Sequence, residues 1–123
     1  MEYGVIIAPK HLAFNDTEIN RTGISVFMTE QQARENELRG TQGIVENAHV
    51  LGVMTAYNRI GVMYAAANQG IQHILRDEWN YGGYIIDDAL TASEYSSAPE
   101  MLMAGNNIFC LDTCLLYTSD AAD

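Results

Sequence analysis

The chain alternates short apolar runs with longer polar or amphipathic stretches. The apolar runs contain β-branched and aromatic residues and are bounded by polar residues, which is the pattern of buried strands. They comprise residues 5–8, 53–56, 84–86 and 108–111. We therefore expect four strands that are separated by helical or loop segments.

Two of the stretches between these runs predict long helices. The first, residues 30–46, follows Thr29, and Gln32 three residues later completes a capping-box pattern. The second, residues 65–78, has the clearer helical periodicity. The expected inward positions are Leu38, Thr41 and Val45 in the first helix and Ala67, Ile71, Ile74 and Leu75 in the second.

A third, shorter helix is predicted before the last apolar run. Ser97 and Glu100 form a second capping box, with Pro99 in the first turn, and Gly105 marks the C-terminal end. The resulting order β-α-β-α-β-α-β is typical of parallel strands joined by right-handed crossovers. Four such strands are half of a (β/α)8 barrel, and a doubly wound open sheet is the alternative. No Gly-x-Gly-x-x-Gly follows a strand, which disfavours the dinucleotide-binding form of that sheet.

Polar side chains follow three of the four apolar runs. Lys10 and His11 come after the first run, and Tyr57 comes after the second. The third run ends in two adjacent carboxylates, Asp87 and Asp88. In a barrel of parallel strands, the carboxyl ends of the strands carry the catalytic groups. We therefore expect these side chains to form one wall of an active site.

Composition narrows the possible partners and cofactors. The net charge of −10 argues against nucleic acid, whose binding needs a basic surface. No apolar run approaches the roughly 20 residues of a membrane span. Asp16 and Glu18 with His11 fit no strong metal-ligand spacing, and 2 cysteines are too few for a zinc site. We expect no metal and no cofactor.

Several motifs, taken in order, resemble those of the β-glucosidases of glycoside hydrolase family 3. They are GVIIAPKHLAFND (residues 4–16), FMTE (27–30), GVMTAYNR (52–59), LRDEW (75–79), GYIIDD (83–88) and AGNN (104–107). Each motif alone is a weak signal. Their shared order over about residues 4–111 makes the resemblance specific.

The resemblance implies a retaining glycosidase on a (β/α)8 barrel, of which this chain would be the C-terminal half. Asp88 falls at the nucleophile of the family, and Tyr57 falls at the tyrosine beside it. Lys10 and His11 fall where the family binds sugar hydroxyls, and Met54 lies on a strand that lines the sugar pocket. The implied reaction is exo-acting hydrolysis of terminal β-linked glucose through a covalent glycosyl-enzyme, so the expected ligand is a small carbohydrate.

The same resemblance implies that this chain is inactive by itself. A retaining enzyme needs a second carboxyl group about 5 Å from the nucleophile, and the family's acid/base glutamate lies in a later domain. The expected partners are therefore the missing half of the barrel and the second domain of a longer chain. A truncated or degenerate relative that binds sugar without turnover is the alternative.

Two positions and the last residues depart from the family pattern. Asp87 stands where the family usually has Ser or Thr, and Ala89 stands where an aromatic residue is frequent. Adjacent residues of a strand point to opposite faces, so Asp87 need not share the pocket with Asp88. We assign residues 1–113 to the partial barrel domain. Residues 114–123 resemble translated sequencing-adapter sequence, and we expect them to be a non-native tail.

Overall fold

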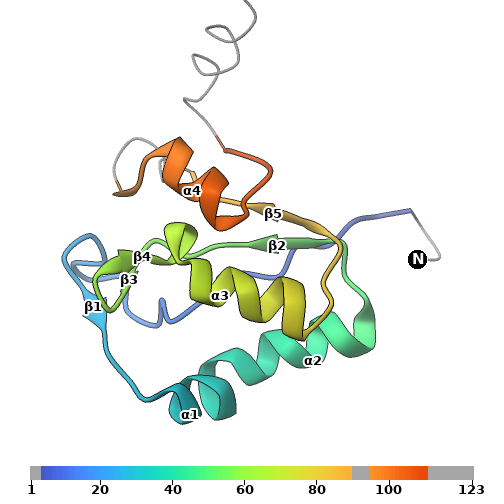
Figure 1. The fold of residues 1–123 in the computed structure, drawn as a ribbon, viewed down its shortest axis with the longest axis horizontal. Helices are drawn as coiled ribbons and strands as arrows, with labels where there is room; N and C mark the ends of the chain where they lie inside the picture. The colour runs from blue at the N-terminus through green and yellow to red at the C-terminus, as the bar shows by residue number, and fades with distance from the viewer. Residues whose placement is uncertain (1–3, 90–94, 111–123) are drawn as a thin grey trace, which may run out of the picture.

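The centre of the fold is a pair of parallel strands. The computed structural model describes residues 4–89 and 95–110. In it, β2 (Gly52–Met54) pairs with β5 (Tyr84–Ile86), and Val53 lies opposite Ile85. Figure 1 shows the two strands side by side, with α2, α3 and α4 following one another beside them. The expected parallel pairing of the second and third apolar runs is confirmed.

One further chain segment pairs on each side of the two strands. Leu12 forms a parallel bridge with Thr55, and its backbone N–H donates to the Met54 carbonyl at 2.8 Å. On the other side, Ile108 forms a parallel bridge with Ile86. Four parallel segments therefore lie next to one another in the order in which they occur along the chain. Together with the helices they form a small α/β unit in which the described strands do not close into a barrel.

The two outer strands are shorter than the sequence predicts. Residues 5–8 form no strand, and the apolar side chains of residues 5–7 are between 51% and 64% exposed. Of the expected strand 108–111, only Ile108 pairs, and Leu111 lies outside the described residues. Each outer segment has one paired neighbour among the described residues. Its second edge is therefore unpaired, and regular strand structure gains little there.

The first predicted helix is confirmed over residues 30–48. It comprises α1 (Glu30–Gln32), the π-helical turn η1 (Ala33–Glu37) and α2 (Leu38–Ala48). The capping box forms as expected, because the Thr29 hydroxyl accepts from the Gln32 N–H and the Gln32 side chain accepts from the Thr29 N–H. Leu38 and Val45 are buried and Thr41 is half-buried, so the inward face is also as predicted.

The second predicted helix is interrupted near its start. It consists of the 3-10 turn η2 (Ala65–Ala67), α3 (Gln69–His73) and the π-helical turn η3 (Ile74–Glu78). Asn68 between the first two has an extended backbone, and its side chain accepts a hydrogen bond from the Ile71 N–H at 3.2 Å. Asparagine favours such caps over helix interiors. The expected inward positions of this helix are confirmed, since Ala67, Ile71 and Leu75 are buried and Ile74 is half-buried.

The short helix α4 (Ala98–Ala104) also begins and ends as predicted. The Ser97 hydroxyl and the Glu100 carboxylate form the reciprocal capping box. Gly105 ends the helix with a φ of 122°, which a residue with a side chain adopts only with strain. No helix within residues 4–89 and 95–110 has the length and apolar character needed to cross a membrane.

The main core lies on one face of the central strand pair. Val53 and Ile85 are fully buried and belong to the same apolar cluster as Leu38 of α2. Side chains alternate along a strand, so the neighbours of these two residues face the other way. Met54 and Ile86 are accordingly only half-buried. The face away from the helices is therefore available for a site.

A small second sheet was not predicted. It contains β1 (Ser25–Val26), β3 (Arg59–Ile60) and β4 (Met63–Tyr64), with β1 parallel and β4 antiparallel to β3. Strands of two residues carry no periodic signal in a sequence. The Arg59 N–H donates to the Ile24 carbonyl at 3.3 Å. This sheet fixes the polar loop that precedes β1 against the segment that follows β2.

We expect Gly83→Ala to destabilise the fold, with Gly82→Ala as the matched control. A Cβ atom at position 83 would lie 2.5 Å from the Leu51 carbonyl oxygen, which accepts a hydrogen bond from the Tyr84 N–H. Nothing lies within 4 Å of a Cβ atom at position 82. Overpacking of this kind costs about 1–3 kcal/mol. Urea unfolding of both variants measures the difference, and equal stabilities would contradict the close approach at Leu51.

Candidate active site

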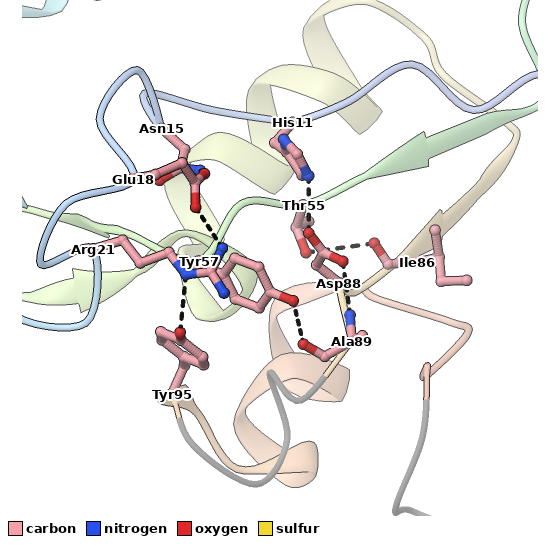
Figure 2. A network of polar contacts seen from close by, with 10 residues as sticks. All are labelled: His11, Asn15, Glu18, Arg21, Thr55, Tyr57, Ile86, Asp88, Ala89 and Tyr95. Atoms are coloured by element: carbon pink, nitrogen blue, oxygen red, sulfur yellow. Dashed lines mark hydrogen bonds and ion pairs between the residues drawn. The ribbon is translucent and has the colours of Figure 1, made fainter.

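A carboxylate and an imidazole meet near the end of β2, approaching from the two segments that flank it. Asp88 follows β5, and His11 directly precedes the residue that pairs with Thr55. His11 Nε2 lies 2.8 Å from Asp88 Oδ2, and the two side chains are 23% and 14% exposed. Asp88 Oδ1 also accepts a hydrogen bond from the Ala89 N–H at 2.8 Å. Figure 2 shows His11 above the carboxylate and Ala89 below it. Asp88 is therefore oriented, yet still accessible to a ligand.

Tyr57 reaches the same carboxylate from the end of β2. Its hydroxyl donates to the Ala89 carbonyl and lies within hydrogen-bonding reach of Asp88. Burial of the ring, followed by the negative charge of Asp88, raises the pKa of Tyr57 to about 12. The phenol therefore remains protonated at neutral pH. It is a neutral hydrogen-bonding group beside Asp88 rather than a second negative charge.

Arg21 lies on the other side of the Tyr57 ring. Its guanidinium carbon is 4.1 Å from the ring centroid, a cation–π contact. Its Nη1 donates to Glu18 Oε2 at 2.5 Å, and Asn15 donates to the same carboxylate. The hydrogen bond from Asn15, followed by that from Arg21, lowers the pKa of Glu18. The polar loop thus brings a fixed positive charge to the site.

Tyr95 completes this group of side chains. Its ring centroid is 4.6 Å from that of Tyr57, and its hydroxyl accepts a hydrogen bond from Arg21 Nε at 3.2 Å. That hydrogen bond is the largest contribution that raises the pKa of Arg21. Neither Arg21 nor Tyr95 was predicted as a site residue. Arg21 lies in a turn and Tyr95 has helical backbone, and no local pattern reveals a contact between residues 74 positions apart.

Curated relatives of the chain are fungal β-glucosidases. The chain is 34% identical over 98 residues to the probable β-glucosidase J of Emericella nidulans, a match that covers 79% of this chain and 12% of that protein. It is 40% identical over 86 residues to a probable β-glucosidase J of Aspergillus fumigatus, covering 69% of this chain and 10% of that protein. No protein-family model matches the chain.

Solved structures give the same relationship. The β-glucosidase of glycoside hydrolase family 3 from Bifidobacterium adolescentis has a TM-score of 0.84 at 30% identity, covering 96% of this chain and 17% of that one. The β-glucosidase 3B of Thermotoga neapolitana in complex with glucose has a TM-score of 0.75 at 31% identity. The match covers 81% of this chain and 14% of that one. The chain is homologous to the β-glucosidases of glycoside hydrolase family 3. It spans only about a tenth to a sixth of the length of these relatives.

The structure brings together three of the five site residues that the family resemblance suggests. Asp88, His11 and Tyr57 meet as described above. Lys10 is exposed and makes no ion pair with a carboxylate among residues 4–89 and 95–110. The contacts of Asp88 described above include His11 and the Ala89 N–H, but not Lys10. Met54 is half-buried on β2, in the alternation that faces away from the helix-covered core.

Asp87 has an environment opposite to that of Asp88. It is fully buried, and its Oδ1 accepts a hydrogen bond from the Cys110 N–H at 2.5 Å. Its Oδ2 has no hydrogen-bond partner within the described residues. Burial is the main cause that raises the pKa of Asp87 to about 6, and the charge of Asp88 raises it further. The alternation along the strand thus gives the two carboxylates different properties.

We expect Asp87→Asn to stabilise the fold at pH 7 more than at pH 4. The folded-state pKa of about 6 exceeds the ordinary value of 3.8, so the folded protein binds more protons between these values. Its stability then falls as the pH rises through this window, and the loss is complete above about pH 6. The amide keeps an oxygen acceptor for Cys110 and avoids the buried charge.

We expect the difference in free energy of unfolding between the variant and the parent to grow by about 2 kcal/mol from pH 4 to pH 7. Urea unfolding at both pH values measures this change. Glu35→Gln, which neutralises an exposed carboxylate on the first helix, is the control and should show no comparable change. A gain for Asp87→Asn that is independent of pH would contradict the burial of an ionisable Asp87.

Proposed function

We propose that this chain is the nucleophile-bearing part of a retaining, exo-acting β-glucosidase. The observation that carries the proposal is the position of Asp88, an accessible carboxylate at the end of a parallel strand, 2.8 Å from His11 and beside the Tyr57 hydroxyl. Catalytic groups of parallel α/β barrels lie at the carboxyl ends of strands. Homology to the β-glucosidases of family 3 supports the same reading.

The proposed reaction proceeds in two steps. An Asp88 oxygen attacks the anomeric carbon of a terminal β-linked glucose as the glycosidic C–O bond breaks, and the leaving oxygen takes a proton from an acid. Water then attacks the same carbon as its bond to Asp88 breaks, and the conjugate base of the acid takes the proton of that water, which releases glucose and restores both groups. The contacts with the Ala89 N–H and with His11 orient Asp88 for the first step.

The proposed ligand contacts surround Asp88 on its accessible side. Lys10 and His11 bind hydroxyl groups of the sugar, and Met54 contacts its apolar face. The exposed ammonium of Lys10 is free of carboxylate partners among the described residues, so a sugar hydroxyl can accept from it. The Thermotoga neapolitana relative, whose structure holds glucose, supports glucose as the sugar.

We further propose that the chain works as part of a longer protein. Its parallel strands fit the C-terminal half of a (β/α)8 barrel, with residues 1–113 as the contribution of this chain and the remaining half supplied by the rest of the protein. The general acid would come from a second domain. The unpaired outer edges at residues 5–8 and 108–110 are where further strands would be added.

The experiment that tests this function uses a hybrid enzyme. Residues 4–110 replace the matching segment of the Bifidobacterium adolescentis enzyme, the relative whose chain aligns with 96% of this one. Incubation with a 2-deoxy-2-fluoroglucoside traps a glycosyl-enzyme, and peptide mass spectrometry locates the label. We expect the label on Asp88. A label on Asp87, or a trapped enzyme with no label in this segment, would contradict the assignment.

Substitutions in the same hybrid should separate the two adjacent carboxylates. Asp88→Ala should lower kcat about 10⁴-fold or more, the scale expected when a covalent catalyst is removed. Asp87→Ser should cost less than about tenfold, because this side chain is fully buried and hydrogen-bonded to the Cys110 N–H. Steady-state hydrolysis of an aryl glucoside measures both. Equal losses at the two positions would show that the carboxylates do not have separate roles.

A further inference from the structure

We propose that Tyr95 is a positioning residue, which holds Arg21 and Tyr57 in place beside the Asp88 nucleophile. The catalytic part of this proposal rests on the proposed function, in which Asp88 is the nucleophile. The contacts among Tyr95, Arg21 and Tyr57 do not depend on that function. Tyr95 lies just before α4 and is 6% exposed. Its ring and hydroxyl contact Tyr57 and Arg21, and we propose that it acts on the site through these two side chains.

The three side chains form a closed group in which each contacts the other two. Arg21 lies over the Tyr57 ring at 4.1 Å, and Tyr95 packs on Tyr57 with centroids 4.6 Å apart and ring planes at 33°. Arg21 Nε donates to the Tyr95 hydroxyl at 3.2 Å. Figure 2 shows the Arg21 guanidinium at the Tyr57 ring and Tyr95 below it, with the Tyr57 hydroxyl extending toward Asp88 and Ala89.

This arrangement restricts the ring whose hydroxyl lies beside the nucleophile. The Tyr57 ring is contacted by a guanidinium and by a second aromatic ring, so it cannot tilt without breaking one of the two contacts. Its hydroxyl is thereby kept on the Ala89 carbonyl and beside Asp88. A hydrogen bond that serves the transition state has its full effect only when the donor is already in position.

Tyr95 itself is supported from the side away from the nucleophile. The ring of Tyr64, on β4, meets it edge-on with centroids 5.9 Å apart. The guanidinium carbon of Arg59, on β3, lies 5.2 Å from the centroid of the Tyr64 ring, and Arg59 Nη2 donates to the Thr22 carbonyl at 3.1 Å. The small second sheet is therefore the support on which the group rests.

Removing the hydroxyl of Tyr95 tests its hydrogen bond to Arg21 separately from the packing of its ring. Within the described residues its hydrogen bond is to Arg21, so Tyr95→Phe removes that contact and retains the stacked ring. Tyr95→Leu removes both contacts. Tyr64→Phe is the matched control, since it removes a hydroxyl from a neighbouring ring that makes no hydrogen bond among the described residues.

The first measurement uses the 123-residue chain and needs no activity. The Arg21 Nε–H resonance is followed by NMR in the parent and in the three variants. We expect Tyr95→Phe to shift this resonance and to accelerate its exchange with solvent by at least tenfold, and Tyr64→Phe to leave it unchanged. An Arg21 resonance that is insensitive to Tyr95→Phe would overturn the proposal.

The second measurement uses the hybrid enzyme described above. We expect Tyr95→Phe to lower kcat by about tenfold with KM changed less than twofold, because the lost contact serves the transition state rather than ground-state binding. Tyr95→Leu should lower kcat further, and Tyr64→Phe should not change it. A kcat for Tyr95→Phe equal to that of the parent would overturn the positioning role. The fluoroglucoside could label no residue of this segment while Tyr95→Phe still shifts the Arg21 resonance. That result would contradict the proposed function and would support the contacts among Arg21, Tyr57 and Tyr95.

Discussion

The register of one pair of parallel strands determines where Tyr57 and Asp88 lie relative to each other. Val53 lies opposite Ile85, so the chain leaves β2 and β5 at the same level, and Tyr57 and Asp88 emerge next to each other. The side-chain period of a strand is two, so a slip of one residue would exchange the faces of Asp87 and Asp88. The parallel bridge at Leu12 then brings His11 to the same end of the sheet.

The two adjacent aspartates have the same side chain but different burial and contacts, because they occupy different positions relative to the sheet. Asp87 points into the face that the helices cover, where burial raises its pKa to about 6 and leaves one oxygen without a partner among the described residues. Asp88 points to the accessible face and contacts His11 and the Ala89 N–H. Only the second position combines access for a ligand with contacts that orient the carboxylate.

Much of this arrangement could be predicted from local signals. The capping boxes at Thr29 and Ser97 fixed the starts of two helices, and the apolar runs at 53–56 and 84–86 identified the central strands. The prediction of a strand at 5–8 was wrong, because an apolar run needs neighbouring strands that the sequence pattern does not reveal. The roles of Arg21 and Tyr95 could not be predicted, since they depend on a sheet of two-residue strands and on contacts between distant parts of the chain.

The most direct test of this account is the register itself, measured by NMR through scalar couplings across backbone hydrogen bonds in the isotope-labelled chain. The account predicts correlations of the Thr55 amide nitrogen with the Ile86 carbonyl carbon and of the Ala56 amide nitrogen with the Leu12 carbonyl carbon, the partners at 2.9 Å and 2.8 Å. A correlation of Thr55 with the carbonyl of Ile85 or Asp87 would contradict it. Asp88 would then face the helices, and the site described above could not form.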